Sequence, residues 1–208
     1  MSIRLKPGQS DRDWYEQYKD LIPLEASDIK LQGHIMHLFP LIHAIKRQAL
    51  AFAKEGQAPS FLEIGSGTAV VSKLLHKTYP KSDIYVVDSD SRITQSLRDN
   101  FPDFNVYLDE AEDMKFSTNV NVIHHQGLLE HFTEVRIRNM LQAHAKLAQS
   151  IVFAVPVKGY PQSDVEEELR LPVNAWCDIV KDAGLTLLEY GEFGINVGYN
   201  EAYFVCHP

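Results

Sequence analysis

A glycine pair behind an apolar run is the feature of this sequence that most directly indicates a ligand site. The segment PSFLEIGSGTAVVSKLL (residues 59–75) has an apolar run with Glu63 near its end, then Gly65 and Gly67, then a run with helical spacing. Glycine after a strand lets the backbone turn tightly and approach a ligand, and the amides that open the next helix face that ligand. Several ligand classes use this arrangement, so the neighbouring residues must distinguish among them.

Two phosphate-binding motifs do not fit this segment. The nicotinamide fingerprint G-x-G-x-x-G/A would place its third small residue at position 70, where the sequence has Val70. The P-loop motif G-x-x-x-x-G-K-[ST] does not occur in the chain. Both phosphate-binding interpretations, including a nicotinamide oxidoreductase, are therefore weakened.

Three groups of acidic residues indicate a different ligand. Glu63 ends an apolar run, where a carboxylate is costly without a partner, and it would repel a pyrophosphate but attract a cation. Asp88 ends the next apolar run, where an acid can accept hydrogen bonds from both hydroxyls of a ribose. Glu112 and Asp113 follow the third run and could accept from the exocyclic amine of adenine. Ribose, adenine and positive charge without phosphate describe S-adenosylmethionine.

Each of these positions also has a purely structural interpretation. The glycines could serve only as turn residues, and Asp88 could serve only as the cap of the following helix. Glu112 and Asp113 could form a solvated surface, and Asp90 is expected to cap a helix or face solvent. The sequence alone leaves these alternatives open.

The elements that position these residues alternate between strand and helix from residue 60 onward. Helices are expected over about residues 68–77, 91–100, 133–148 and 172–184, with Gly184 as the last stop. The expected strands are SFLEI (60–64), DIYVVD (83–88), NVYL (105–108), VNVIHH (120–125), SIVFAVP (150–156), LTLLEYGEF (185–193) and AYFVCH (202–207). This alternation predicts a parallel sheet with helices on both faces.

The first 56 residues differ in texture and are expected to be helical. One helix is predicted within residues 11–22 and another from Ser27 or Asp28 to Gly56, with a kink or a break at Pro40. Three histidines in this region have spacings that could suit a metal, but no cysteine or well-placed carboxylate joins them. They are His34, His37 and His43. No metal site is expected.

Length and composition restrict the class of protein. The chain has 208 residues, which favours one domain, and a formal net charge of −8, which disfavours nucleic acid as a partner. Cys177 and Cys206 are too few for a disulfide framework and indicate reduced thiols in a cytoplasmic protein. The polar start lacks the apolar core of a signal peptide, and no apolar run reaches the ~18 residues of a membrane span. A homodimer stays open.

Five motifs, in order, resemble those of class I S-adenosylmethionine-dependent methyltransferases. FLEIGSGTA is similar to the first motif of that family, E/D-x-G-x-G-x-G, with Ala69 in place of the last glycine. VVDSD resembles the ribose-binding strand end, and AEDMKF resembles the adenine-side motif. HHQGLLEHF resembles the segment after the fourth strand, and LPVNAWCDIVKDAGL resembles the late helix. The resemblance covers about residues 59–207 and departs at Asn121, where the family often has Asp.

The resemblance implies an α/β fold, a doubly wound Rossmann-like sheet of seven mostly parallel strands with a C-terminal antiparallel hairpin. Extra N-terminal helices, residues 1–56, would form a lid with Tyr15 and Tyr18 as candidate lid aromatics, and residues 57–208 would form the cofactor-binding core of one compact domain. The residues implied to bind S-adenosylmethionine are Glu63, Gly65, Ser66, Gly67, Asp88, Ser89, Ala111, Glu112, Asp113, His125 and Gln126.

Methyl transfer from a sulfonium is an in-line displacement, so the protein mainly aligns the reactants and excludes water. A base is needed only if the acceptor carries a proton, and histidine serves near neutral pH. The candidate catalytic residues are His125, Glu130 and His131, although Glu130 and His131 could be purely structural. His124 and His125 are neighbours on a strand, so at most one of them is expected to face the pocket.

The acceptor is expected to be a small molecule. A methyltransferase for a protein or another macromolecule and a catalytically silent cofactor-binding scaffold are the alternatives. The loop KGYPQSDVEEELR (158–170) carries Asp164, Glu166, Glu167 and Glu168 and is expected to border the substrate entrance. Its acidity would disfavour anionic acceptors and favour neutral or amine-bearing ones, unless these acids are only a solvated helix start.

Overall fold

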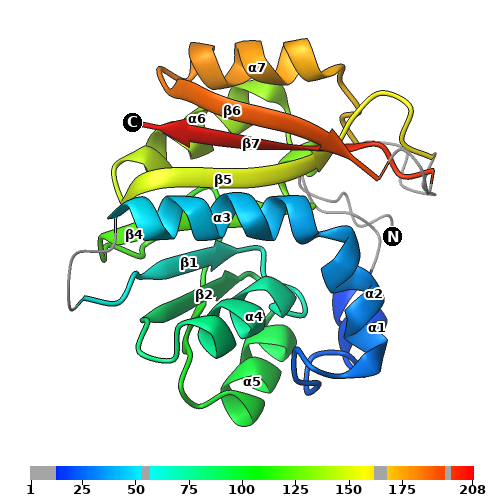
Figure 1. Cartoon of the computed structure of the whole chain (residues 1–208), viewed down its shortest axis with the longest axis vertical. Coiled ribbons are helices and arrows are strands. Elements are labelled where there is room, and N and C mark those ends of the chain that lie inside the picture. The colour runs from blue at the N-terminus through cyan, green and yellow to red at the C-terminus, as the bar shows by residue number, and fades with distance from the viewer. Residues whose placement is uncertain (1–12, 53–56, 162–167, 195–197) are drawn as a thin grey trace, which may run out of the picture.

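The alternating pattern folds into one seven-stranded sheet in the order β3-β2-β1-β4-β5-β7-β6 (Figure 1). A computed structural model describes residues 13–52, 57–161, 168–194 and 198–208. The strands are β1 (Phe61–Ile64), β2 (Ile84–Asp88), β3 (Asn105–Leu108), β4 (Val120–Gln126), β5 (Ala148–Pro156), β6 (Thr186–Phe193) and β7 (Glu201–His207). All neighbouring pairs are parallel except β5 with β7 and β6 with β7, which confirms the predicted C-terminal hairpin.

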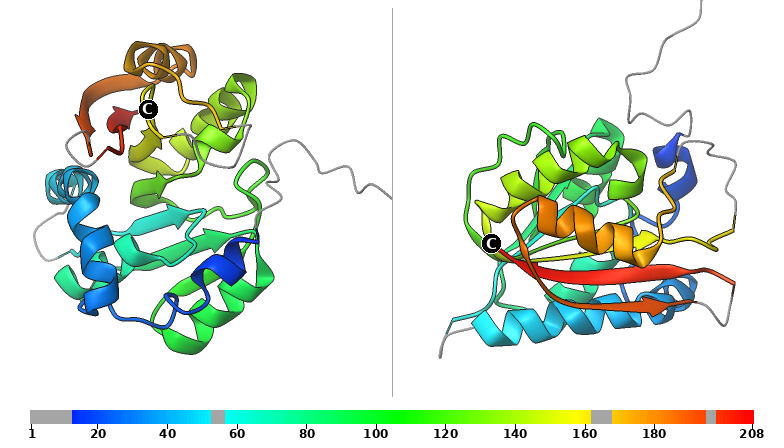
Figure 2. Two further views of the ribbon diagram at one scale, coloured as in Figure 1. Left: turned by 90° about the vertical axis from the view of Figure 1, so that its right-hand side faces the viewer. Right: turned by 90° about the horizontal axis from the view of Figure 1, so that it is seen from above.

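Helices cover both faces of this sheet. They are α1 (Trp14–Tyr18), α2 (Ile29–His37), α3 (Phe39–Phe52), α4 (Val70–Thr78), α5 (Ser91–Asn100), the 3-10 turn η1 (Leu129–His131), α6 (Glu134–Ala145) and α7 (Val173–Asp182). Figure 2 shows α3 on one side of the sheet and α6 with α7 on the other. The side chains of α4 and α5 share the apolar layer of α3. The fold is therefore the doubly wound sheet that the sequence predicted.

Strand periodicity explains how two apolar layers form. Phe61 of β1 packs into the layer under α3, α4 and α5, whereas its neighbours Leu62 and Ile64 pack into the layer under α6 and α7. Every residue of β1 is buried, as expected for a central parallel strand with helices on both faces. A side chain such as that of Glu63, which alternates onto the α4 face, is therefore removed from water unless a cavity reaches it.

The N-terminal helices break where Pro40 predicted. α2 ends at His37 and α3 begins at Phe39, which places Pro40 in the first turn of α3, where its missing amide costs no helical hydrogen bond. Asp28 is the N-cap of α2, and its carboxylate accepts a hydrogen bond of 2.9 Å from the Lys30 amide. The predicted stop at Gly56 lies outside the described residues.

Residues 1–56 were predicted to form a lid, but only some of the described residues in this region lie at the cavity. The apolar face of α3 packs against β4, β5 and β7, so this helix is part of the layer that covers the sheet. The segments of this region that border the ligand cavity are α1, α2, the loop between them and Pro40 in the first turn of α3. Figure 1 shows where α1, α2 and α3 lie relative to the sheet. The loop between α1 and α2 is anchored by the buried Lys73 ammonium of α4, which donates to the Ile22 carbonyl at 2.7 Å. Residues 1–12 and 53–56 lie outside the described ranges.

Both cysteines are buried as free thiols, Cys177 on α7 and Cys206 on β7. Burial raises the pKa of the Cys206 thiol to about 12, so this group stays protonated near neutral pH. Over the part of the chain that the structure describes, no helix combines the length and the apolarity that crossing a membrane requires.

Candidate functional site

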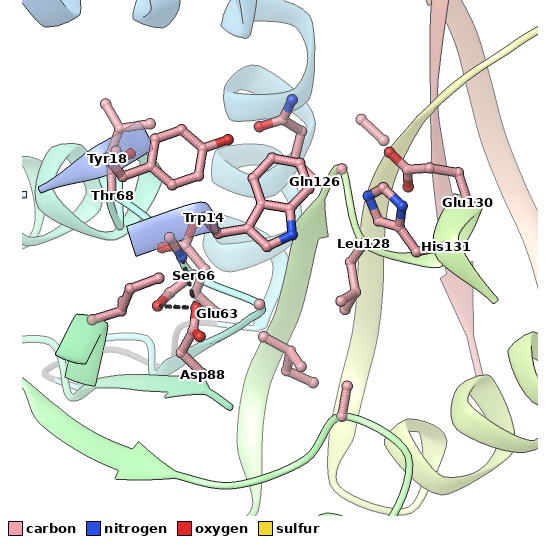
Figure 3. A pocket seen from close by; sticks show the side chains of 18 of the residues that line it. Trp14, Tyr18, Glu63, Ser66, Thr68, Asp88, Gln126, Leu128, Glu130 and His131 are labelled. Carbon is pink, nitrogen blue, oxygen red and sulfur yellow. Dashed lines mark hydrogen bonds between the residues drawn. The ribbon is translucent and has the colours of Figure 1, made fainter. Parts of the chain in front are cut away.

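A cavity of about 1690 Å³ lies at the carboxyl ends of β1, β2 and β4. The chain order reverses between β1 and β4, and open α/β sheets bind their ligands outside the strand ends at such a switch point. The turn after β1, the end of β2 and the segment after β4 supply its floor, and α1 and α2 border its rim. Figure 3 shows side chains that converge on the pocket from four of these segments. The labelled residues lie on α1, at the end of β1 and in the turn after it, on β2, and at the end of β4 and in the segment after it.

The turn after β1 has a backbone that only small residues fit. Gly65 and Gly67 have φ angles of 67° and 48°, and Ala69 shares this left-handed conformation with a φ of 52°. A Cβ atom on Gly65 would lie 2.8 Å from the Leu128 side chain, and one on Gly67 would lie 3.3 Å from the Tyr18 ring. The alanine that replaces the last motif glycine thus keeps the glycine conformation, at a cost of roughly 1–2 kcal/mol.

Glu63 places a buried carboxylate beside this turn. Its side chain lines the cavity, and its Oε2 accepts a hydrogen bond of 3.1 Å from the Ser72 amide in the first turn of α4. Burial raises the pKa of Glu63 to about 7, against the opposing effects of the Ser72 hydrogen bond and the Lys73 charge. A cation in the cavity would stabilise the ionised form, because a nearby opposite charge favours the carboxylate.

Asp88 closes the other side of the turn. Its Oδ2 accepts from the Gly67 amide at 2.9 Å and from the Ser66 hydroxyl at 3.4 Å, as Figure 3 shows, and its Oδ1 accepts from the Asp90 amide at 3.0 Å. The cap of α5 is Asp90, which accepts from the Arg92 amide at 2.8 Å. Asp88 is therefore oriented by the glycine turn at the cavity wall, and the cap that the sequence allowed for it belongs to Asp90.

The adenine-side residues also line the cavity, but they differ in their partners. Glu112 forms a bidentate ion pair with Arg136 of α6, whereas Asp113 is exposed at the rim. Asp109, which the sequence did not single out, accepts hydrogen bonds from the Lys115 amide at 2.6 Å and from the Phe116 amide at 3.2 Å. It thereby organises the loop that carries these residues. Of the predicted set, Ser89, Ala111, Glu112 and Asp113 all border the cavity.

The two strand histidines point to opposite faces of the sheet, and His125 does not reach the cavity. Its fully buried imidazole stacks on Phe153 with ring centroids 5.5 Å apart and meets His144 of α6 at 5.8 Å. Burial lowers its pKa well below the ordinary range, and lowers that of His124 to about 3. The expectation that His125 acts in catalysis is not kept, because its ring is a neutral part of the α6 layer. The next residue, Gln126, does line the cavity.

Glu130 and His131 lie together on the cavity wall in η1 (Figure 3). The Glu130 side chain is 4% exposed, and burial raises its pKa to about 8 with added repulsion from Glu168 and Glu201. The His131 ring meets the Trp14 ring of α1 edge-on, with centroids 5.7 Å apart. Both residues are therefore positioned to face an acceptor.

Helix α1 is held across the cavity by aromatic and ionic contacts. Trp14 also stacks on Tyr18 at 5.8 Å, and Asp13 forms an ion pair of 2.8 Å with Arg92 of α5. Tyr15 packs under the Arg92 guanidinium at 4.8 Å and lies outside the cavity lining. Of the two predicted lid aromatics, Tyr18 thus borders the cavity, and sequence reasoning missed the role of Trp14 because an aromatic helix face is usually packed in the core.

Most residues at the end of the cavity opposite the glycine turn were not predicted from the sequence. This end is lined by side chains from segments that are far apart in the chain, namely His37, Tyr160, Glu168, Phe193, Tyr199 and Glu201. Glu168, from the predicted acidic loop, forms an ion pair of 3.0 Å with Arg170. Asp164, Glu166 and Glu167 of that loop lie outside the described residues. Across residues 13–52, 57–161, 168–194 and 198–208, no three or more His, Cys, Asp or Glu side chains gather to hold a metal ion.

Comparisons with known proteins show a family model and several solved structures that this chain resembles. The family model for a methyltransferase domain matches residues 61–150. Magnesium protoporphyrin IX methyltransferase from Synechocystis, solved with bound S-adenosylmethionine, has a TM-score of 0.70 at 12% identity over 100% of both chains. A methyltransferase from Aquifex aeolicus that depends on S-adenosylmethionine has a TM-score of 0.67 at 18% identity, over 93% of this chain and 98% of its own.

A chain from the complex between the Haloferax volcanii Trm112 methyltransferase activator and a methyltransferase has a TM-score of 0.66 at 14% identity. It aligns over 95% of this chain and 99% of its own length. No curated protein has a significantly similar sequence. At these identities the solved structures establish a shared fold.

The matched segment spans the part of the cavity that was predicted to hold the cofactor. Residues 61–150 run from β1 through β4 and include the glycine turn, Asp88 and η1. The turn lies so close to Leu128 and Tyr18 that a Cβ would crowd them, and the carboxylates suit a ligand with a cationic end and a ribose. Residues 61–150 match a methyltransferase domain, and this match together with the shared fold supports a class I S-adenosylmethionine-dependent methyltransferase with S-adenosylmethionine as its cofactor.

Proposed function

We propose that this enzyme methylates a small-molecule acceptor bound inside the cavity. The observation that carries the proposal is the enclosure of the site, because the contact between Trp14 and His131 joins α1 to η1 across the cavity. The volume of about 1690 Å³ exceeds the ~300–1,000 Å³ typical of a pocket for one ligand. A cofactor and a small acceptor can therefore share this space.

On the cofactor side, each residue has a proposed role. Glu63 would attract the cationic methionine end, and the glycine turn would let that end approach the backbone. Asp88 would accept hydrogen bonds from the ribose hydroxyls, and Asp113 would lie beside the adenine. When bound, S-adenosylmethionine supplies an electrophilic methyl group on a sulfonium.

On the acceptor side, the chain aligns the acceptor and excludes water. Positioning of this kind accounts for up to ~7–11 kcal/mol of a barrier in oriented reactions. His131 and Glu130 are the proposed proton acceptors for an acceptor atom that carries a proton at attack. Both lie on the cavity wall, whereas His125 is excluded from this role by its packing.

A macromolecular acceptor is the second candidate. A chain of the same fold occurs in a complex with a methyltransferase activator, so this architecture also works with a protein partner. The net charge of −8 disfavours nucleic acid as the acceptor. The contact between Trp14 and His131 partly covers the cavity and restricts access for a large acceptor.

Turnover of methyl-labelled cofactor against fractionated cell extract tests the choice between these acceptors. A labelled compound below ~1 kDa that separates from the cofactor on chromatography is expected together with S-adenosylhomocysteine, in proportion to enzyme, because the cavity has room for a small acceptor. A Gly65→Val enzyme, whose turn should exclude the cofactor, is the control for label that transfers without catalysis. Label that enters only the protein or RNA fraction would overturn the small-molecule assignment.

A further inference from the structure

The end of the cavity opposite the glycine turn is lined by residues that have no role in the proposed binding of the cofactor. Three glutamates, Glu130, Glu168 and Glu201, line it together with His37 and the rings of Tyr160, Phe193 and Tyr199. We call these residues the acceptor-side cluster. They come from α2, η1, the segment after β5, and the β6–β7 end, so only the folded chain brings them together.

Two of these glutamates are buried without hydrogen-bond partners. Glu130 is 4% exposed and Glu201 is 6% exposed, and within the described part of the chain the Oε2 atom of each has no hydrogen-bond partner. His37 Nε2 lies 3.3 Å from Glu201 Oε2 and forms an ion pair with it when the imidazole is protonated. Burying a carboxylate in this way is costly, and the cost falls when a ligand supplies the missing donors.

The charges around Glu130 are acidic. The charged side chains that raise its pKa, besides burial, are Glu168 and Glu201. Glu168 pairs with Arg170 at 3.0 Å, and the Arg170 guanidinium lies over the Tyr160 ring at 6.0 Å. Burial and the same acids raise the pKa of Tyr160 to about 12, so its phenol stays neutral near pH 7. The cluster therefore holds three carboxyl groups beside one guanidinium and one imidazole, and a cation in the cavity would favour ionisation of Glu130.

Aromatic rings continue from these carboxylates in an unbroken chain. Tyr160 and Tyr199 have ring centroids 5.7 Å apart, Tyr199 and His37 are 6.0 Å apart, and His37 and Phe193 are 5.4 Å apart. Aromatic faces attract cations through the ring quadrupole. Carboxylates beside aromatic rings in one cavity are a recognition surface for an alkylammonium group.

We propose that the methyl acceptor carries an ammonium group, which binds between Glu130 and Glu201 with the rings of Tyr160 and Tyr199 beside it. The acceptor is thus a small amine, whichever of its atoms receives the methyl group. This inference rests on the proposed function, because it names the substrate class of the same cavity.

Binding of an ammonium group should release a proton. With a pKa of about 8, Glu130 keeps its proton near pH 7 in the free enzyme, and a neighbouring cation favours the carboxylate instead. The affinity for an amine is therefore expected to rise as pH increases from 6 to 8. Glu168, Glu201, Tyr160, Arg170, His37 and His131 are the other titratable or charged groups at this end of the cavity, and they act on the same equilibrium.

Calorimetric titration with matched probes tests the proposal. The probes are 2-phenylethylamine, the neutral 2-phenylethanol and the anionic 3-phenylpropionate, each titrated into free enzyme and into enzyme saturated with S-adenosylhomocysteine. The amine is expected to bind at least roughly tenfold more tightly than the alcohol at pH 7.5, as expected for a charge-assisted hydrogen bond. Its binding heat should differ between buffers of high and low ionisation enthalpy, which reports the released proton.

Substitutions of the two glutamates test whether they cause the preference for the amine over the alcohol. Glu130→Gln and Glu201→Gln should each reduce the preference for the amine over the alcohol by at least roughly fivefold and leave the affinity for S-adenosylhomocysteine unchanged. Glu192→Gln is the matched control, because Glu192 is exposed on β6 outside the cavity lining. The melting temperature of each variant shows that it is folded, and the unchanged cofactor affinity shows that its cavity is formed.

Four results would overturn the proposal: no amine binding at millimolar concentration, equal binding of amine and alcohol, a preference that survives both substitutions, or competition between the amine and S-adenosylhomocysteine. The last would assign the acidic end to the amino group of the cofactor. Failure of S-adenosylhomocysteine to bind would instead refute the cofactor side, and the titration of the free enzyme would still decide whether the amine site exists.

Discussion

The two ends of the cavity treat buried carboxylates in opposite ways. At the cofactor end, Asp88 accepts three hydrogen bonds and Glu63 accepts one, all from residues 66–90. At the acceptor end, an oxygen of Glu130 and an oxygen of Glu201 have no hydrogen-bond partner within the described residues. The carboxylates of the first end are thus oriented by the protein itself, whereas at the second end a ligand would supply the missing donors.

The difference also concerns how the chain builds each end. The cofactor end is assembled from one strand–turn–helix–strand unit, β1 to α5, so its geometry follows from local sequence. The acceptor end collects single side chains from four separate segments, and its properties follow from the tertiary fold. A substitution at the first end should therefore alter a fixed geometry, while one at the second should alter charge and solvation.

The substitution Gly65→Val should have the largest effect and would break the cofactor end alone. The valine side chain would meet Leu128 and fill the space left for the ligand, in a backbone with a φ of 67°. Binding of S-adenosylhomocysteine, measured by calorimetry, should weaken by roughly 100-fold or more. Gly184→Val is the control, because Gly184 has a φ of 80° with open space around it, and it should lose only ~1–2 kcal/mol of stability. Normal binding by Gly65→Val would show that the ligand lies elsewhere.

Asp88→Ala comes next and tests whether this carboxylate serves the ligand as well as the turn. Loss of hydrogen bonds to a charged acceptor should weaken S-adenosylhomocysteine binding by roughly 1.5–3 kcal/mol, or about 10- to 150-fold. The comparison variant is Asp103→Asn, because the Asp103 side chain is 81% exposed, away from the cavity. An unchanged dissociation constant for Asp88→Ala would show that Asp88 does not bind the ribose of the cofactor.

The pH dependence of cofactor binding should sharpen the comparison further. Glu63, with a pKa of about 7, is mostly protonated at pH 6 and mostly ionised at pH 8 in the free enzyme. Because only the carboxylate attracts a cation, cofactor affinity should rise by about tenfold over this range. The slope should be smaller in Glu63→Gln. An equal slope in both proteins would place the titrating group in the ligand or elsewhere in the cavity.

Removal of the Trp14 ring should have the smallest effect. Helix α1 has only five residues, so tertiary contacts hold it in place. Loss of the contacts with Tyr18 and His131, each an aromatic pair worth ~0.5–1.5 kcal/mol, should raise the cofactor dissociation rate by roughly 2- to 10-fold in stopped-flow measurements. Tyr15→Ala, outside the cavity, should change it less. Equal rates in Trp14→Ala and wild type would remove α1 from the proposed lid.

Much of the fold could be predicted from the sequence because its strands are short apolar runs with clear boundaries. All seven strands and the break near Pro40 are observed within a few residues of their expected positions. The place of α3 was not predictable, because an apolar helix face shows that a helix is buried but not against which surface. The resemblance to a known family, rather than periodicity, supplied the topology of the sheet.

For the site, locality decided what could be predicted. Residues of the glycine turn and Asp88 line the cavity as expected, since their roles depend on neighbours in the sequence. His125 failed because strand alternation shows that His124 and His125 face opposite ways without showing which face reaches a ligand. Glu201 and Tyr160 could not be found from the sequence, because the residues beside them in the cavity come from other segments of the chain.

The position of α3 has a consequence for how the chain acquires its structure. This helix is made early in synthesis, yet the strands that bury its apolar face include β5 and β7, which are made more than a hundred residues later. Its contacts therefore close long loops, which slows folding and leaves an apolar helix exposed on the growing chain. A ribosome-bound chain that ends before β7 should bind a chaperone through α3, and release of the complete chain should end that dependence.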